Sequence, residues 1–527
     1  MTVRISFLIS CVLLPLAILL ISKLWPPVLW FWLLVGPYIL LGLYDIFQTR
    51  RTILRIYPVI GHIRYLFEYI RPEIQQYFVE SDLNGKPIAR EFRSLVYQRA
   101  KNQTDTRPFG TIIDTYKNGY EWINHCMQPL HVDPDKVRTD FGNHNCETPY
   151  SASPLNISAM SYGALSKNAI MALNRGAKLG GFSHNTGEGG ITSFHREHGG
   201  DLVWQIGTGY FGCRDEDGFF SPEKFREAAT EDQVKMIEIK ISQGAKPGHG
   251  GILPAAKLTE EIASIRQVPM GQDVISPSFH SAYSNPEELL QFVVQLRQLS
   301  GGKPVGFKLC LGKKSEFLGI CKAMKETGIT PDFITVDGGE GGTGAAQIEF
   351  TNSVGTPLRE GLHFIHNAVL GVGMRDRLNI IAAGKSLSAY HMIRMGALGA
   401  DTVNSARGMM FSLGCIQARH CNTDNCPTGI ATQNPFRYNM LDVTDKGARV
   451  FNYHCAMVKA LAELLGQLGV NSLTDVKPMH VNRRINNETV KTYEEIYPDY
   501  ESGFLLNDST IPDGWQKEWD RSAVNHW

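Results

Sequence analysis

The sequence has no excess charge of either sign, and this excludes one class of partner. Lysine plus arginine and aspartate plus glutamate each number 52 in 527 residues, so the formal net charge is zero. Proteins that bind the phosphate backbone of nucleic acids carry a clear basic excess. Nucleic acid is therefore not expected as a partner.

Cysteine is scarce, and low-complexity tracts are absent. Ten cysteines in 527 residues are too few for a secreted disulfide scaffold and indicate a reducing compartment. Hydrophobic residues make up 43% of the chain and charged residues 20%, which excludes a disordered protein. The Walker motif of P-loop enzymes is also missing. The length permits several small domains or one large α/β domain with extensions.

Two long hydrophobic runs stand near the N-terminus. Eighteen uncharged residues separate Arg4 from Lys23, and twenty-one more separate Lys23 from Asp45. Each run can span the hydrocarbon core of a membrane, about 30 Å, as a helix. A cleaved signal peptide would explain the first run alone. The second run favours a transmembrane helical hairpin over residues 1–48, with a tight turn near Lys23.

Positive charge sets the expected orientation of this hairpin. Arg50, Arg51 and Arg55 follow the second run, whereas the turn carries only Lys23. Basic residues are retained on the cytoplasmic side of membrane proteins. We therefore expect a multi-pass protein of the inner (cytoplasmic) membrane, with the lipid bilayer as a partner and the catalytic domain in the cytoplasm.

Residues 49–130 form the expected helical connecting region between the hairpin and the body. Within it, residues 55–70 alternate basic, aromatic and aliphatic side chains as an amphipathic helix does. Such a helix either lies on the bilayer or packs on the catalytic body, because a wide apolar stripe serves both purposes. The sequence leaves these two alternatives open.

From about residue 150, short β-rich runs alternate with segments of helical periodicity, which is typical of a parallel sheet. Polar residues and glycine follow these runs, as they do at the active sites of barrel enzymes. The sequence predicts an α/β fold, a TIM-type (β/α)8 barrel. The nine candidate strands exceed the eight that a barrel needs, so one early run is expected to be a hairpin or loop strand. They are residues 156–160, 181–185, 202–205, 236–240, 273–276, 305–308, 333–337, 378–382 and 401–404.

Three late strand ends have the composition of a phosphate cradle. A glycine-rich run follows the strand that ends at Asp337, and each of the next two strands is followed by a loop that contains a cation. One glycine-rich turn is usually only a turn, but three in series match the phosphate site that barrels build after strands seven and eight. The candidate residues are Gly338, Gly339, Gly384, Lys385, Ala406 and Arg407.

A cysteine motif follows these loops. Cys415, Cys421 and Cys426 have the spacing Cys-x5-Cys-x4-Cys, and a proline follows the last of them. Zinc would need a fourth ligand, and His420 is badly placed beside Cys421. Three cysteines on a polar loop are also not typical of core packing. The motif therefore favours a three-iron cluster.

Six separated segments resemble the synthase domain of glutamate synthases, over about residues 130–475. The resemblance implies an FMN-binding (β/α)8 barrel over residues 131–475 with a 3Fe-4S cluster, and a C-terminal extension over residues 476–527. It implies that reduced flavin delivers hydride to 2-iminoglutarate, which forms from 2-oxoglutarate and ammonia. The segments that carry it are residues 157–166, 185–190, 243–248, 340–345, 374–377 and 426–433.

The resemblance also implies roles for individual residues. Cys415, Cys421 and Cys426 would hold the cluster. Glu188 would relay a proton, and the cations Lys246 and Arg266 would bind the dicarboxylate substrate. Salt bridges at the rim of the barrel are the alternative for these two cations. The remaining residues would contact the flavin, along its ring or near its polar edge: Ser158, Ala159, Met160, Ser161, Gln205 and Lys308.

The chain also departs from this family. Ile252 stands where the family has glutamine, and the loop over residues 276–284 differs. A membrane flavin oxidoreductase for another 2-oxo acid, imine or amine is therefore an alternative, as is an electron-transfer subunit. No amidotransferase domain precedes the barrel, so ammonia is expected from a partner or from solution. Electrons are expected from a ferredoxin, a flavoprotein or a membrane donor.

Overall fold

The computed structural model describes residues 3–142 and 145–527. These residues form two compact units, Met1–Arg90 and Glu91–Trp527, and each unit is described by itself. The first unit contains the predicted hairpin, and the second contains the predicted barrel.

The N-terminal unit begins with two apolar helices, α1 (Val3–Ser22) and α2 (Trp32–Phe47), joined by a 3-10 turn at Pro26–Phe31. By length and composition, Val3–Ser22 and Pro26–Phe47 are each able to cross a membrane. The two helices pack on each other, because the Phe7 ring fills the space beside Gly42 and lies 5.3 Å from the Tyr38 ring. The prediction of two long apolar helices is thus confirmed.

Two shorter helices follow in the same unit, α3 (Thr52–Ile56) and α4 (Gly61–Ile74), and a π-helical segment at Gln75–Val79 continues α4. Asp45, in the last turn of α2, is fully buried. Its carboxylate accepts a hydrogen bond from the Val59 amide at 2.9 Å and lies 2.8 Å from His62 Nε2. The start of α4 is therefore fixed at the end of α2.

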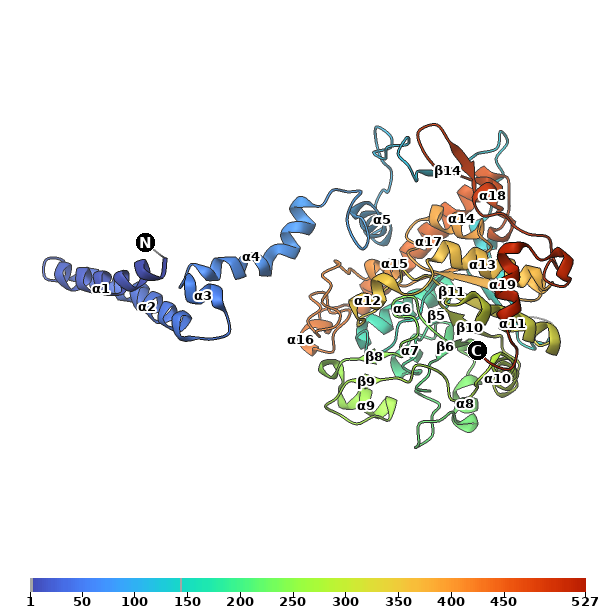
Figure 1. Cartoon of the computed structure of the whole chain (residues 1–527), viewed down its shortest axis with the longest axis horizontal. Coiled ribbons are helices and arrows are strands. Elements are labelled where there is room, and N and C mark those ends of the chain that lie inside the picture. The colour runs from blue at the N-terminus through green and yellow to red at the C-terminus, as the bar shows by residue number, and fades with distance from the viewer. Residues whose placement is uncertain (1–2, 143–144) are drawn as a thin grey trace. The chain divides into compact units, whose positions relative to one another are not determined.

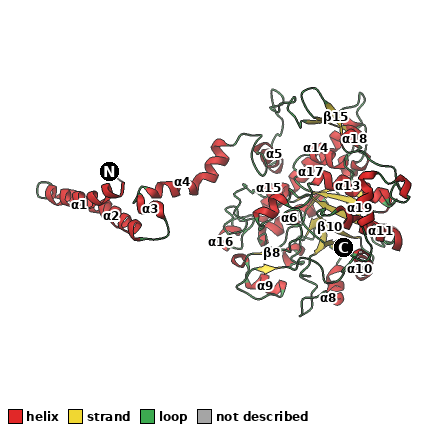
Figure 2. Cartoon of the chain, in the orientation of Figure 1, coloured by secondary structure: helices red, strands yellow, loops and turns green. Residues whose placement is uncertain are grey.

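The second unit is built around a closed barrel of eight parallel strands, which confirms the predicted fold class. Figure 1 and Figure 2 show these strands at the centre of the unit with helices around them. The barrel strands, in spatial order, are β4 (Leu155–Ile157), β5 (His184–Asn185), β6 (Leu202–Ile206), β7 (Val234–Lys240), β10 (Val305–Leu309), β11 (Phe333–Asp337), β12 (Asn379–Ala383) and β13 (Thr402–Ser405).

One of the nine candidate strands lies outside the barrel, but it is the fifth along the chain and not one of the early runs. Residues 273–276 contribute β9 (Val274–Ile275), which pairs antiparallel with β8 (Ile252–Leu253). Both strands lie in the long connection between β7 and β10, so they form an excursion at the carboxyl end of β7.

Helices alternate with the barrel strands, and local signals fix their ends. The Ser166 hydroxyl caps α6 by accepting the Ala169 amide, and Gly181 ends that helix with a φ of +61°. The helices of the unit are α5 (Arg90–Ala100), α6 (Lys167–Gly180), α7 (Ser193–Arg196), α8 (Pro222–Ala229), α9 (Glu260–Arg266), α10 (Pro286–Leu299), α11 (Lys314–Thr327), α12 (Ile348–Ser353), α13 (Leu358–Gly371), α14 (Ala389–Gly396), α15 (Arg407–Ser412), α16 (Pro435–Tyr438), α17 (Val443–Leu468), α18 (Tyr493–Ile496) and α19 (Asp513–Arg521).

A two-stranded sheet of β2 (Thr139–Phe141) and β3 (Tyr150–Ala152) closes the amino-terminal end of the barrel. Phe141 is fully buried in one cluster with Val203, Met236 and Phe333, which lie near the starts of their strands. The opposite end carries the polar residues. A further sheet of β1 (Glu121–Ile123), β14 (Val481–Arg484) and β15 (Val490–Thr492) lies outside the barrel.

A buried ion pair joins α10 to the start of β11. Arg297 Nη2 and Nε lie 2.8 and 3.1 Å from Asp332 Oδ2, and both side chains are nearly inaccessible to solvent. The same carboxylate oxygen accepts the Val305 amide at 2.8 Å, and the Arg297 guanidinium also donates to the Thr330 carbonyl. This pair therefore connects one barrel helix with two neighbouring strands.

Candidate active site

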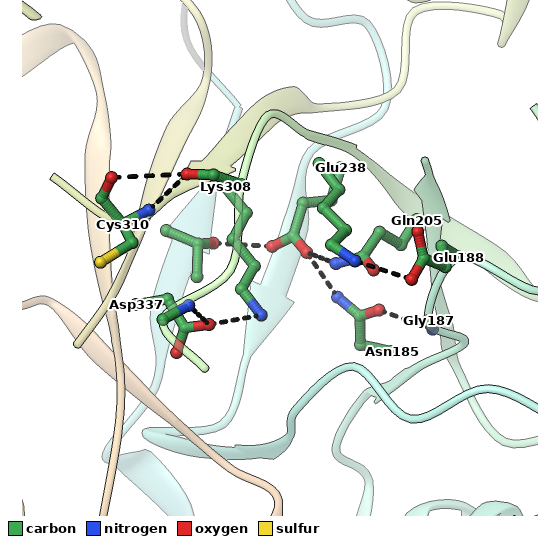
Figure 3. A network of polar contacts seen from close by, with 12 residues as sticks. Asn185, Gly187, Glu188, Gln205, Glu238, Lys308, Cys310 and Asp337 are labelled. Atoms are coloured by element: carbon green, nitrogen blue, oxygen red, sulfur yellow. Dashed lines mark hydrogen bonds and ion pairs between the residues drawn. The ribbon is translucent and has the colours of Figure 1, made fainter. Parts of the chain in front are cut away.

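Glu238 is the centre of a buried polar network inside the barrel (Figure 3). Its carboxylate accepts hydrogen bonds from Asn185 Nδ2 at 2.9 Å, Gln205 Nε2 at 2.6 Å and Thr335 Oγ1 at 2.7 Å. Each of these residues comes from a different strand. The network fixes the Gln205 side chain, one of the predicted cofactor contacts, in a single orientation.

Lys308, the other predicted contact near the polar edge, is ion-paired. Its Nζ lies 3.1 Å from Asp337 Oδ2 at the ends of β10 and β11, as Figure 3 shows. Burial alone would lower the pKa of Lys308, but Asp337 and Glu238 outweigh burial and raise it. Lys308 is therefore a fixed positive charge at this edge of the barrel.

Glu188 is the centre of a second cluster, which is rich in cations. Lys240 Nζ donates to Glu188 Oε1 at 2.7 Å, and Lys246 and Arg266 also act electrostatically on this carboxylate. Burial would raise the pKa of Glu188, but the three cations lower it overall. The structure thus brings together the three predicted catalytic residues, Glu188, Lys246 and Arg266.

The cations of this cluster are buried. Lys246 and Arg266 are 1% and 5% exposed, and burial lowers the pKa of Lys246 to about 8 and that of Arg266 to about 10. Arg266 Nη2 donates to the Tyr162 carbonyl, its guanidinium lies 5.1 Å from the centre of the Phe211 ring, and its Nε has no hydrogen-bond partner. Three cations around one carboxylate leave two positive charges unbalanced, which makes the cluster a site for an anion.

The segment predicted to contact the flavin ring adjoins this cluster. Residues 158–161 follow β4, and the Ser158 amide donates to the Ser405 carbonyl. A Cβ atom on Gly187 would meet the backbone of Met160 and Ser161, and one on Gly189 would meet Ser161 and Arg266. The two glycines therefore allow the loop that carries Glu188 to lie directly against this segment.

The three loops of the predicted phosphate cradle converge. Arg407 donates to the Glu340 carbonyl, and burial and the charge of Arg407 both lower the pKa of Lys385. Two cations placed this close repel each other, so an anion between them would be stabilised. The amides of Gly338 and Gly339 donate to the carbonyls of Ala383 and Thr356, so the glycines bring the loops together. Ala406 lies directly before α15, at whose first turn Arg407 stands.

The three predicted metal-binding cysteines lie on one loop after α15. Burial, with the charges of Cys421 and Cys426, raises the pKa of Cys415 to about 12, against the opposing effect of a hydrogen bond from the Gln417 amide. For Cys426, burial acts in the same direction, but hydrogen bonds from Thr428 and the following backbone amides lower its pKa overall. Amide donors directed at a sulfur are typical of iron–sulfur ligands. The donor set therefore fits a cluster of thiolate-bound irons.

A single metal ion fits this loop less well. Within residues 3–142 and 145–527, no group of three His, Cys, Asp or Glu side chains is arranged to hold a metal ion. A three-iron cluster makes a different demand, because each thiolate binds a different iron. Lys257, 2% exposed, donates to the carbonyls of Ala164 and Cys421 and thereby connects the cysteine loop with the chain that follows the flavin segment.

Glu238 and Lys240, which organise the two clusters, were not among the residues predicted from the sequence. The sequence did contain a signal. Both residues are charged, and they alternate with isoleucine in the strand Met236-Ile-Glu-Ile-Lys240. Alternate residues of a strand face the same side, so two charges spaced in this way on a buried strand point together into the barrel.

Comparison with known proteins places this chain in a family. A model of the conserved region in glutamate synthase matches residues 91–471. The glutamate synthase large subunit-like protein YerD of Bacillus subtilis is 38% identical over 476 residues, 82% of this chain and 90% of that protein. The archaeal glutamate synthase (NADPH) of Methanocaldococcus jannaschii is 34% identical over 360 residues, 68% of this chain and 66% of that protein.

One further relative aligns with a smaller part of its own length, and the solved structures have lower sequence identity. The ferredoxin-dependent glutamate synthase 2 of Synechocystis is 31% identical over 345 residues, 60% of this chain and 21% of that protein. Among solved structures, a mandelate oxidase mutant with a monooxide FMN adduct aligns with 82% of this chain and 99% of its own, at a TM-score of 0.40 and 16% identity. The family model and the relative from Bacillus subtilis are sufficient for an assignment: the chain belongs to the glutamate synthase family of oxidoreductases.

Proposed function

We propose that the protein is an FMN- and iron–sulfur-dependent enzyme that reduces 2-iminoglutarate, formed from 2-oxoglutarate and ammonia, to glutamate. The observation that carries this proposal is the charge of the Glu188 cluster. Lys240, Lys246 and Arg266 surround one carboxylate, so the cluster has two excess positive charges. A dicarboxylate carries two negative charges and would balance them.

In this proposal the chain's own residues bind the substrate and move a proton. Arg266 binds one carboxylate through its guanidinium, and Lys246 neutralises the other. The ionised Glu188 carboxylate accepts a hydrogen bond from Lys240 Nζ at 2.7 Å through Oε1. The Lys240 ammonium can therefore supply a proton that Glu188 relays to the substrate nitrogen.

Other residues would hold the cofactors. Lys385 and Arg407 would bind the FMN phosphate, residues 158–161 would line the flavin ring, and Lys308 would stabilise negative charge near its polar edge. Cys415, Cys421 and Cys426 would bind the 3Fe-4S cluster. When bound, the flavin supplies the hydride and the cluster carries electrons to it.

The electron donor and the anchor complete the proposal. We propose a ferredoxin, a flavoprotein or a membrane donor as the source of electrons, and a partner or solution as the source of ammonia. We also propose that α1 and α2 anchor the enzyme in the cytoplasmic membrane, with the barrel on the cytoplasmic side. This is supported by their length and by the low buried share of the two spans, 11% and 17%.

A second candidate is the same chemistry on another 2-oxo acid. Ile252 stands directly after Gly251, which lies so close to Glu188 that a Cβ atom there would clash with the carboxylate. An apolar side chain next to this contact favours a substrate that offers fewer hydrogen bonds than 2-oxoglutarate does.

Stopped-flow reoxidation of the reduced flavin tests both candidates. We expect 2-oxoglutarate plus ammonia to accelerate reoxidation, and a panel of mono- and dicarboxylic 2-oxo acids to rank the substrates. Faster reoxidation by another member of the panel would favour the second candidate. Equal rates with and without every 2-oxo acid would contradict both.

Arg266→Ala should raise the KM for a dicarboxylic 2-oxo acid. Loss of a charge-assisted contact costs about 1.5–3 kcal/mol, which corresponds to roughly 10- to 150-fold in binding. Steady-state kinetics with di- and monocarboxylic 2-oxo acids would measure this effect. Arg214→Ala is the matched control, because its guanidinium also lies against Phe211, at 5.7 Å. Equal KM changes in the two variants would contradict the assigned role.

Dicarboxylate binding should depend on pH through the ammonium group of Lys246. Its pKa is lowered to about 8, so its ammonium is present below pH 8 and is lost as the pH rises through that value. We therefore expect the Kd of a dicarboxylate to increase between pH 7 and pH 9. The change in the flavin spectrum on binding, without ammonia, would measure it. Lys246→Arg, which keeps its charge, should flatten the profile, and an equally steep profile in this variant would exclude Lys246 as the titrating group.

A further inference from the structure

Helix α4 of the N-terminal unit has an apolar face that no other described element of this unit covers. Ile63, Leu66, Phe67 and Ile74 are 52%, 56%, 59% and 37% exposed. Leu66 and Phe67 stand three and four residues after Ile63, and Ile74 stands seven residues after Phe67. The four side chains therefore form one stripe along the helix. Tyr77, Phe78 and Val79 in the π-helical segment that follows are also exposed. An exposed apolar stripe of this length marks a surface that packs against another protein or against a membrane.

The position of α4 in its unit indicates what covers the stripe. Asp45 stands two residues before the end of the apolar helix α2, and its buried carboxylate contacts His62 in the first turn of α4. The Val59 amide binds the same carboxylate. The start of α4 therefore lies level with the end of α2, which in a membrane-spanning helix is the level of the lipid headgroups.

The charged side chains on and around α4 agree with a position at the lipid headgroups. Residues 48–74 contain five arginines, two glutamates and no lysine. Arg64 and Arg71 are seven residues apart, so they stand on one edge of the apolar stripe, and both are exposed. Long cationic side chains beside an apolar face are typical of helices that lie on anionic membranes, because the stem remains in apolar surroundings while the charge reaches the phosphates.

We propose that α4 lies in the surface of the bilayer, with Ile63, Leu66 and Phe67 among the acyl chains and with Arg64 and Arg71 at the phosphates of anionic phospholipids. This inference rests on the proposed membrane anchor and adds to it a second, lipid-selective contact. It also decides between the two alternatives that the sequence left open for residues 55–70, in favour of the bilayer.

Photo-crosslinking in the full-length protein tests the proposal. Phe67→p-benzoylphenylalanine places a reactive group on the apolar stripe, and Glu68→p-benzoylphenylalanine places the same group on the polar side of the same turn. Leu13→p-benzoylphenylalanine, at an exposed position in the middle of α1, reports on the anchor. Each variant is reconstituted into phosphatidylcholine vesicles with or without phosphatidylglycerol, and lipid adducts are measured by mass spectrometry.

We expect severalfold more lipid adduct at Phe67 than at Glu68, with a further increase when phosphatidylglycerol is present. Arg64→Gln with Arg71→Gln should abolish that increase while the Leu13 adduct is unchanged. A Leu13 adduct without an excess at Phe67 would overturn the proposal and leave the anchor intact. Loss of the Leu13 adduct would overturn both. A Phe67 crosslink to a protein, including a second copy of this chain, would replace the bilayer as the occupant.

Discussion

Replacing Cys421 by serine should remove the iron from the purified protein. A serine hydroxyl is a poor substitute for a thiolate, and a cluster that depends on three ligands is not held by two. Cys421 interacts electrostatically with Cys426, and its carbonyl accepts a hydrogen bond from Lys257. The substitution changes one sulfur to oxygen, so the loop itself should be retained.

Iron content, visible absorption and the paramagnetic signal measure this effect, and FMN should remain bound. Cys455→Ser is the matched control, because Cys455 is an exposed thiol on α17. It should leave the iron content unchanged. Equal iron in Cys421→Ser and in the unmodified protein would contradict the cluster assignment and would leave the barrel and the flavin proposal untouched.

Arg297→Met should lower the free energy of unfolding of the barrel unit by about 3–5 kcal/mol, because it leaves the buried Asp332 carboxylate without its counter-ion. Asp332 Oδ2 keeps its hydrogen bond from the Val305 amide, but a neutral donor does not replace the positive charge of the Arg297 guanidinium. Arg297→Lys keeps the charge and loses the two-point contact, so its effect should be smaller.

Denaturant unfolding with a check of reversibility measures this loss. Lys313→Met is the control on the surface, because Lys313 lies 3.0 Å from Glu316 and its side chain is 78% exposed. Surface pairs of this kind contribute about 0–1 kcal/mol. An effect of Arg297→Met as small as that of Lys313→Met would contradict a stabilising role for the buried pair.

The barrel was predictable because its signals are local. Each strand is a short β-rich run followed by polar residues or glycine, and a serine cap or a left-handed glycine marks the ends of α6. The run at residues 273–276 has the same local composition, and only its pairing with Ile252–Leu253 shows that it lies outside the barrel. That pairing depends on a connection of some twenty residues, which composition does not encode.

The candidate site was predictable in part for a related reason. Glu188 and Lys246 stand in segments that resemble a family, whereas Glu238 and Lys240 acquire their importance from partners on other strands. The resemblance predicts Gln205, but nothing in the sequence connects it with Asn185 and Thr335, and the three become a set only when three strands place them around one carboxylate. In the same way, Asp45 and His62 are 17 residues apart and meet only because a turn follows α2.

The sheet of β2 and β3 closes the amino-terminal end of the barrel, so that access is from the carboxyl-terminal end. Because Phe141 packs in the buried cluster at the amino-terminal end, a molecule that reaches the Glu188 cluster enters and leaves through the carboxyl-terminal end. A group bound at the carboxyl-terminal end therefore controls the exchange of ligands with the Glu188 cluster. Under the proposed function, a flavin ring bound there would exclude water from the interior, and product and substrate would have to exchange through the same end of the barrel.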